Sequence, residues 1–206
     1  MKATLIDSMG SDLTVVNAAR VSFGKKHEEF DEDKDTKLIH YLAKHNHKSP
    51  FGHCFASFHV KAPIFVARQL VKHKFLRWNE ISRRYVDEEP EFYSPLVWRG
   101  RSEDKKQGSE GEVDYGVLVN FYDNCLFEYT TMLDEGVAPE QARMVLPQST
   151  YTEWYWSGSL DAFADMCNLR CKEDTQWETR QIANQIDEEM GKLYPVAWEA
   201  LRAYAD

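Results

Sequence analysis

The sequence is poor in the features that mark several large classes of protein. Its 206 residues include only four cysteines, ten glycines and seven prolines, which excludes both a disulfide-stapled secreted domain and a fibrous repeat. No apolar run approaches the ~20 residues of a membrane span, and the N-terminal residues lack the apolar stretch of a secretory signal. We therefore expect a globular protein of the cytoplasm, with free thiols and no membrane partner.

Positive charge is scarce overall but concentrated in one segment. The chain has 25 basic and 34 acidic residues, for a formal net charge of -9, which argues against a general nucleic-acid partner. Six of the basic residues nevertheless lie between positions 68 and 84, where Glu80 is the only acid. This basic island suits a phosphate-bearing small molecule, although a solvated basic face paired with the acidic remainder explains the composition equally well.

Hydrophobic periodicity predicts strands separated by longer helices, and hence an α+β fold in a single domain spanning residues 1–206. Alternating residues indicate strands at 2–8, 54–61 and 149–156. Helical spacing and capping residues indicate helices at 12–20, 63–73, 114–134, 160–171 and 175–204. Turn formers without a hydrophobic period indicate an exposed loop at about 99–112.

The densest polar cluster of the chain lies within the basic island. Gln69, Lys72 and His73 are three and four residues apart, so we expect them to share one face of a helix. Asn79 and Ser82 are weak helix formers, so the chain should leave the helix before them. A helix end followed by an irregular basic segment can surround an anion from several directions.

The order of residues in this cluster is specific. The segment KHKFLRWNEISRRY at 72–85 resembles the signature of the flavin-dependent thymidylate synthases, in which Arg-His-Arg is followed after seven residues by serine. Five more segments resemble the family in the same order: AARVSFGK (18–25), HKSPFGH (47–53), FHVKAPIFVARQ (58–69), EQARMVLP (140–147) and NLRCKEDTQWE (168–178). The resemblance covers nearly the whole chain and implies a mostly antiparallel central sheet flanked by helices.

The resemblance implies a binding site for deoxyuridine monophosphate (dUMP). The positions that match the family's nucleotide contacts are Gln69, Lys72, Glu80, Ser82, Arg83, Arg84, Arg143 and Arg170. Arg170 is implied to lie against the uracil ring and to favour its N3-ionised form, which makes it the main candidate catalytic residue. Ser82 stands at the position of a candidate nucleophile, but no adjacent histidine activates it, so substrate binding is its better role.

The same resemblance implies FAD as the cofactor. Positions matching the family's flavin contacts are Ser49, Lys72, His73, Lys74 and Glu80, while His47 matches a histidine near the flavin and folate. By this likeness methylenetetrahydrofolate donates the carbon and NADPH reduces the FAD. Each site is implied to lie between subunits of a homotetramer, with residues 80–84 supplied by a neighbouring chain. We expect no metal, because the histidine spacing matches no common zinc pattern.

Several positions depart from the family pattern. Lys72 and Lys74 replace the two signature arginines, which keeps the charge but loses the bidentate fork of a guanidinium. The other departures, near the adenylate end of the flavin, introduce a serine and three carboxylates: Ser159, Asp161, Asp165 and Asp174. Because added carboxylates oppose a pyrophosphate, we expect these changes to weaken flavin binding.

The sequence, taken with the resemblance, predicts a flavin-dependent thymidylate synthase that reductively methylates dUMP to dTMP. Two alternatives stay open. A related pyrimidine nucleotide hydroxymethylase would use the same methylene donor, with water in place of hydride. A non-catalytic nucleotide- or nucleic-acid-binding protein would use the basic island alone, and binding to nucleic acid would fall steeply with salt.

Overall fold

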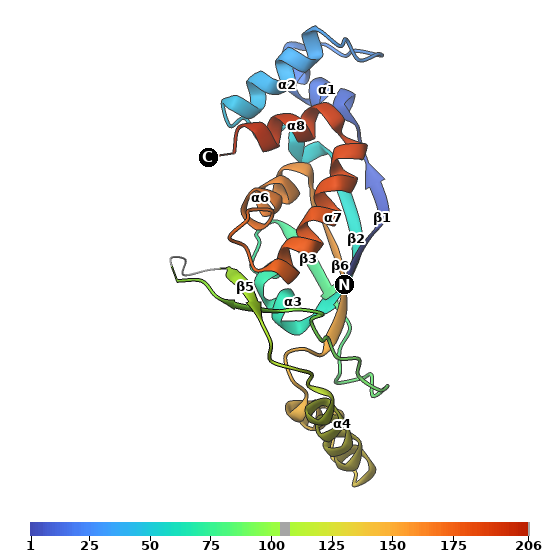
Figure 1. Cartoon of the computed structure of the whole chain (residues 1–206). Coiled ribbons are helices and arrows are strands. Elements are labelled where there is room, and N and C mark those ends of the chain that lie inside the picture. Colours follow the sequence, from blue (N-terminus) through green and yellow to red (C-terminus); the bar gives the residue numbers. More distant parts are fainter. Residues whose placement is uncertain (104–107, 206) are drawn as a thin grey trace.

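A four-stranded antiparallel sheet forms the centre of the computed structural model, which describes residues 1–103 and 108–205 (Figure 1). The strand order is β1-β2-β6-β3, and each neighbouring pair is antiparallel. The strands are β1 (Lys2–Met9), β2 (Phe55–Pro63), β6 (Tyr151–Ser159) and β3 (Leu76–Glu80). The predicted α+β class with a mostly antiparallel sheet is therefore confirmed.

The two central strands alternate between apolar and polar side chains, as the sequence predicts. β2 and β6 pair along their whole length, from Phe55 opposite Ser159 to Pro63 opposite Tyr151. The strand predicted at 149–156 therefore lies at 151–159, because pairing with β2 determines the ends of β6 more than the β propensity of its own residues does. One face of the sheet is apolar and buried: Ala56, Phe58, Val60, Ala62, Trp154 and Trp156.

Helices pack against the apolar face of the sheet and extend from both of its ends (Figure 1). The helices are α1 (Asp12–Arg20), α2 (Lys34–Lys44), α3 (Ile64–Leu70), α4 (Val119–Asp134), α5 (Pro139–Ala142), α6 (Leu160–Arg170), α7 (Trp177–Leu193) and α8 (Pro195–Ala203). Short 3-10 turns lie at Val21–Phe23, Phe51–His53 and Arg143–Val145. Across the described residues, no helix combines the length and the hydropathy that a membrane crossing requires.

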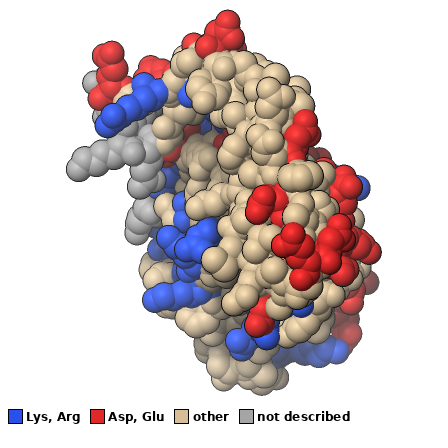
Figure 2. All heavy atoms as spheres, turned by 90° about the horizontal axis from the view of Figure 1, so that it is seen from below, with Lys and Arg blue, Asp and Glu red and all other residues tan. Residues whose placement is uncertain are grey.

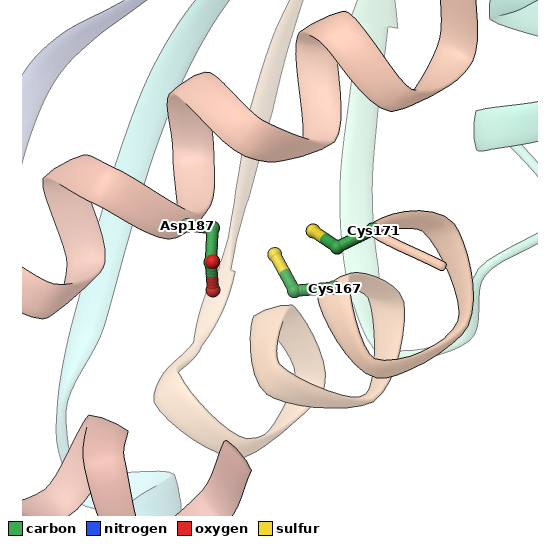
Figure 3. Close-up of side chains that lie close together, drawn as sticks. All are labelled: Cys167, Cys171 and Asp187. Carbon is green, nitrogen blue, oxygen red and sulfur yellow. The ribbon is translucent and has the colours of Figure 1, made fainter. Parts of the chain in front are cut away.

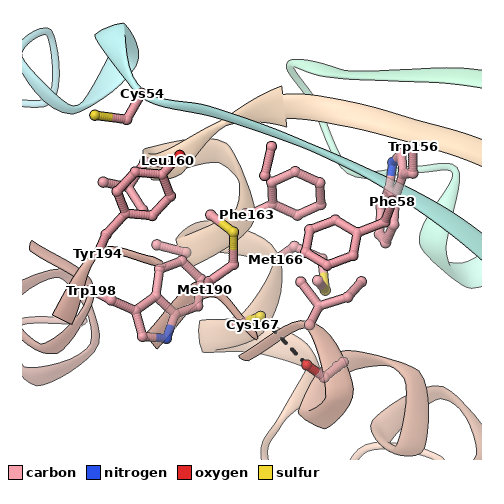
Figure 4. Packing of buried hydrophobic residues seen from close by; sticks show 14 of the residues in the cluster. Cys54, Phe58, Trp156, Leu160, Phe163, Met166, Cys167, Met190, Tyr194 and Trp198 are labelled. Atoms are coloured by element: carbon pink, nitrogen blue, oxygen red, sulfur yellow. Dashed lines mark hydrogen bonds between the residues drawn. The ribbon is translucent and has the colours of Figure 1, made fainter. Parts of the chain in front are cut away.

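The hydrophobic core lies between the sheet and helices α6 and α7 (Figure 4). Phe163 of α6 packs edge-on against Phe58 of β2 and Trp156 of β6, with ring centroids 5.3 and 5.6 Å apart. The thiol of Cys167 on α6 donates to the carbonyl of Ala183 on α7 at 3.7 Å. Each fully buried large side chain contributes about 1.5–3 kcal/mol, so this packing holds α6 firmly between the sheet and α7.

The helix predicted at 175–204 is wrong in one respect, because the chain breaks between α7 and α8. Pro195 has no N–H and disfavours helical geometry at Tyr194, which lies at φ -136° and ψ 63°. The carboxylate of Asp12 caps α8 by accepting from the N–H groups of Val196 and Ala197 at 3.1 and 2.9 Å. Burial raises the pKa of Asp12, and these two hydrogen bonds oppose the rise.

The segment expected to be an exposed loop at 99–112 contains a β-hairpin instead. Strand β4 (Trp98–Arg101) pairs with β5 (Ser109–Val113), and residues 104–107 of the expected loop lie outside the described residues. A Cβ at Gly100 would lie 2.7 Å from the carbonyl oxygen of Glu110, so glycine permits the strands to approach. Polar strand sequences like these carry no hydrophobic period, which explains why the pattern predicted a loop.

Helix α4 lies apart from the sheet, at the end opposite α1, α2 and α8 (Figure 1). It begins at Val119, five residues later than the predicted start at 114. Only Tyr129 of this helix is buried, while Phe121 and Phe127 are 49% and 69% exposed. The apolar residues that predicted α4 therefore do not serve the main core.

Candidate active site

The basic island begins where helix α3 ends. The prediction that Gln69, Lys72 and His73 share a helical face is wrong, because α3 stops at Leu70 and a tight turn follows. The turn includes Phe75 at φ 64°, after which β3 pairs Leu76 with Gly158 of β6. Pairing of β3 with β6 therefore overrides the local helical preference. As a result, Lys72 and His73 lie in the turn and do not continue the face of α3 that carries Gln69.

Arg170, at the C-terminal end of α6, nevertheless meets this turn. Its Nε donates to Nε2 of His73 at 2.9 Å, and a terminal nitrogen donates to the backbone carbonyl of Gln69 at 3.3 Å. Because His73 accepts this bond at Nε2, its single proton lies on Nδ1. The structure thus brings together three predicted site residues that lie up to 101 positions apart.

Among Gln69, His73 and Arg170, the positive charge lies on Arg170. Burial, and next the charge of Arg170, lower the pKa of His73 to about 4, against a weak opposing effect of Asp165. Burial also lowers the pKa of Arg170 from its ordinary value, but an arginine side chain remains protonated in proteins. His73 is therefore a neutral hydrogen-bond partner that orients a cationic Arg170.

A chain of hydrogen bonds continues from Gln69 into the first turn of α7. The side-chain Nε2 of Gln69 donates to Oε1 of Gln176 at 2.5 Å. Nε2 of Gln176 in turn donates to Oε2 of Glu178 at 3.1 Å. Glu178 is 4% exposed, and its Oε1 accepts from Tyr93 at 3.2 Å and from the guanidinium of Arg99. We call this chain the glutamine relay.

Sequence reasoning missed the last four members of the glutamine relay. The segment at 168–178 was recognised as family-like, but only Arg170 in it was assigned a role. Tyr93 and Arg99 lie in stretches without a recognisable motif. The available signal was the QWE tripeptide at 176–178, two polar residues flanking an aromatic at a helix start.

A cavity lies beside the glutamine relay. It measures about 520 Å³, and both aromatic and polar side chains line it. Arg99 also stacks over the Trp177 ring, 4.8 Å from the centroid, which fixes the β4–β5 hairpin against α7. Four members of the glutamine relay line the cavity, namely Tyr93, Arg99, Gln176 and Glu178, and Phe65 and Gln148 are also part of its wall.

The second group of predicted residues follows β3. Glu80 is held by two donors, the hydroxyl of Thr152 at 2.6 Å and the indole of Trp78 at 3.0 Å. Ser82 starts a turn in which its hydroxyl oxygen accepts from the backbone N–H of Arg84 at 3.3 Å. Arg83 donates to the carbonyl of Glu88. The hydroxyl of Ser82 is thus part of a turn.

Arg84 and Arg143 come together around one acidic residue. Arg84 pairs with the carboxylate of Glu140 at 3.6 Å, and Nε of Arg143 donates to the Glu140 carbonyl at 3.3 Å. Both arginines are exposed. In the described part of the chain, no hydrogen bond or ion pair joins this group to that of Arg170.

The residues expected to contact flavin lie in two places, the turn after α2 and the segment that follows α3. Ser49 and His47 are exposed there, and Lys72 and Lys74 are exposed on the turn after α3. Between His47 and Ser49, Lys48 contacts both oxygens of Asp165 at 2.7 Å. Three lysines line a cavity of about 430 Å³ together with this carboxylate: Lys44, Lys48, Lys172 and Asp165.

Three of the departures from the family pattern, Ser159, Asp161 and Asp165, are engaged in contacts within the chain. Asp165 is neutralised by Lys48, and Asp161 accepts from the hydroxyl of Ser159 at 2.5 Å. Asp174 remains exposed. On the face of the molecule drawn in Figure 2, acidic side chains gather mainly toward the right and basic ones mainly toward the left and the bottom, with some of each sign among the other.

A further cluster of ionisable groups lies inside the helical layer. The sulfurs of Cys167 and Cys171 and a carboxylate oxygen of Asp187 lie within 4.8 Å of one another (Figure 3). Oδ1 of Asp187 accepts from the indole of Trp198 at 3.0 Å, and it lies 2.9 Å from Nε of Arg202 in an ion pair. These bonds already engage the carboxylate, so the cluster is explained as a link between α6, α7 and α8.

Comparison with known proteins shows the family of this chain. Residues 4–196 match the family described as thymidylate synthase complementing protein. A flavin-dependent thymidylate synthase of Thermus thermophilus is 42% identical over 204 residues, covering 97% of this chain and 75% of that protein. The enzyme of the same name from Thermotoga neapolitana is 39% identical over 202 residues, covering 98% and 90%.

A solved structure shares the fold. The UMP/dUMP methylase PolB from Streptomyces cacaoi, bound with 5-Br dUMP, superposes with a TM-score of 0.88 at 35% identity, covering 99% of this chain and 95% of that one. Its complex with 5-Br UMP gives a TM-score of 0.86 at 32% identity, covering 99% and 94%. The chain therefore belongs to the family of thymidylate synthase complementing proteins, the flavin-dependent thymidylate synthases.

Proposed function

We propose that the protein methylates dUMP at C5 to give dTMP, with methylenetetrahydrofolate as carbon donor and FAD reduced by NADPH as hydride source. The observation that carries the proposal is the oriented guanidinium of Arg170 beside Gln69, in a chain that matches flavin-dependent thymidylate synthases over nearly its full length. In the overall change the C5 proton leaves, and the transferred methylene gains a hydride to become a methyl group.

Arg170 is the residue that activates the pyrimidine in this proposal. Nε and one terminal nitrogen of Arg170 are engaged by His73 and Gln69, so its remaining terminal nitrogen is available to the base. A fixed cation beside the ring stabilises negative charge that develops on N3 and the adjacent oxygen. Because His73 is neutral, it orients the guanidinium without adding a competing charge.

The group after β3 binds the nucleotide phosphate in this proposal. Arg84 contacts the carboxylate of Glu140 and Arg143 contacts its backbone carbonyl, and two guanidinium groups suit a phosphate dianion. Ser82 takes a binding role, which is supported by its hydroxyl being held in a turn by the Arg84 N–H. Glu80, Arg83 and Lys72 complete the proposed nucleotide contacts.

The residues present fit a flavin. Lys44, Lys48 and Lys172 line a cavity of about 430 Å³ beside Asp165, which supplies more positive than negative charge for a pyrophosphate. Ser49, His47, Lys72, His73, Lys74 and Glu80 are the proposed flavin contacts. A bound reduced flavin supplies the hydride, while the protein's own groups bind and orient the pyrimidine.

A homotetramer with shared sites accounts for two features of the single chain. Within the described residues, no hydrogen bond or ion pair joins the Arg170 group to the Arg84 group. In addition, Phe121 and Phe127 of α4 are 49% and 69% exposed. A neighbouring copy that brings its Arg84 group to Arg170 would complete a site. Free buried thiols such as Cys54 and Cys167 support a reducing, cytoplasmic setting.

A product assay under anaerobic conditions tests the proposed function. Purified protein is incubated with FAD, NADPH, methylenetetrahydrofolate and dUMP, with UMP and dCMP as comparison nucleotides, and products are identified by mass spectrometry. We expect dTMP, dependent on FAD. Hydroxymethyl-dUMP as the main product, or no turnover of dUMP with flavin bound, would contradict the proposal.

A further inference from the structure

The glutamine relay contains a buried carboxylate that the proposed reaction does not use. Glu178 is 4% exposed and lies in the first turn of α7, where a negative charge is favoured by the helix dipole. It accepts three hydrogen bonds, from Tyr93, Arg99 and Gln176. A buried charge with this many donors is fixed in place, so it can fix its neighbours in turn.

The chemistry of the side chains determines which atom donates and which accepts at each step of the glutamine relay. An ionised carboxylate only accepts hydrogen bonds, so Gln176 must turn its amide nitrogen toward Glu178. Its carbonyl oxygen then faces Gln69, and Gln69 must donate with its own amide nitrogen, as the 2.5 Å contact requires. Among the hydrogen bonds of the described residues, Oε1 of Gln69 takes part in none.

We propose that Glu178 is a positioning residue for nucleotide binding, which acts through Gln176 to make the carbonyl oxygen of Gln69 the group offered to the pyrimidine. The inference rests on the proposed function, since Gln69 is there a contact of dUMP. A neutral amide at position 178 could donate as well as accept, so both glutamines could then flip. Gln69 would lose its fixed orientation while every side chain kept its size.

A double-mutant cycle on nucleotide affinity tests this inference. Glu178→Gln is prepared in the wild-type chain and in Gln69→Ala, and the Kd for dUMP is measured for all four proteins with FAD bound. We expect Glu178→Gln to raise the Kd about tenfold in the wild-type chain, the size of one hydrogen bond. In the Gln69→Ala background it should change the Kd less than about twofold, because its route of action is gone.

A second variant protects the test against a folding defect. Glu178→Gln leaves the partly buried guanidinium of Arg99 with a weaker partner, whereas Gln176→Met interrupts the relay and keeps the Glu178–Arg99 pair. We expect Gln176→Met to reproduce the loss of dUMP affinity, with an unchanged Kd for FAD. Asp12→Asn is the matched control, because Asp12 is also a mostly buried carboxylate, and it caps α8 away from the site.

The outcomes separate this inference from the proposed function. An equal loss of dUMP affinity in both backgrounds, or a similar loss in Asp12→Asn, would show a merely structural role and overturn the inference. Tight dUMP binding that Gln69→Ala leaves unchanged would overturn it and leave the proposed function standing. A wild-type protein that loads FAD but does not bind dUMP would overturn both.

Discussion

The two halves of the candidate site are built in opposite ways. In the first, Arg170 is half-buried and tied to His73 and to the backbone of Gln69. In the second, Arg84 and Arg143 are exposed, and their contacts are with Glu140, a residue of the same surface. The first half is preorganised by one chain, whereas the second is open to a partner and a phosphate. Preorganised charge suits catalysis, and exposed charge suits capture of the substrate.

The largest expected effect is the loss of the preorganised half. Arg170→Ala should lower turnover at least about 10³-fold, because it removes an oriented charge from the reacting ring. Thermal unfolding should change little, since the side chain is not part of the core. The measurement is dTMP formation alongside a circular dichroism melt. The matched control is Arg180→Ala, whose guanidinium donates to the carbonyl of Glu173, and near-normal turnover of Arg170→Ala would refute the assignment.

Mixing Arg84→Ala with Arg170→Ala tests whether the two halves of a site come from different chains. Arg84→Ala should weaken dUMP binding about 10–100-fold, the usual loss for a hydrogen bond to a charged group. If Arg84 and Arg170 meet across a subunit boundary, unfolding and refolding the two variants together should restore part of the activity, because some sites then contain both arginines. If mixed oligomers form but activity is not restored, both arginines of a site belong to one chain.

Lys48 compensates for a departure from the family in the flavin region. Lys48→Ala should weaken FAD binding several-fold, because it removes a cation and leaves Asp165 uncompensated beside the cavity. Flavin affinity is measured by absorbance titration. Lys34→Ala, which removes an exposed pair with Asp31, is the matched control. Tighter FAD binding in Lys48→Ala would mean that the adenylate end lies elsewhere.

The smallest expected effect concerns the pH dependence of stability through His73. Its pKa is about 4 in the folded chain and about 6.5 when exposed, so the unfolded state binds more protons between these values. Stability should therefore fall as the pH drops from about 6.5 toward about 4. The full difference between these pKa values corresponds to about 3 kcal/mol, and because His73 is only half-buried, solvent screening reduces it to about 1 kcal/mol. Relative to His73→Gln, the wild-type Tm should therefore fall on the order of 3 °C further over this window. An identical pH dependence in both proteins would contradict the assigned environment.

Local patterns predicted a large part of the fold. Alternation located β2 within two residues, and capping residues located α1 and α6 within one. The failures have a common cause, because the end of α3 at Leu70 and the shift of β6 both follow from pairing between distant strands. The β4–β5 hairpin lacks apolar alternation and gave no local signal.

Sequence order also identified the family, and it predicted the residues of both halves of the candidate site, but it did not indicate how each half is held. Arg170 meets His73 across 97 positions, and Gln69 meets Gln176 across 107. Contacts at such separations leave no periodicity in the chain, so only the packing of α3, α6 and α7 on the sheet reveals them. The sequence by itself determined which chemical groups are present and which family they belong to. The tertiary structure decided which groups are neutral, which are oriented and which stay open, because burial and hydrogen-bond partners set protonation and direction.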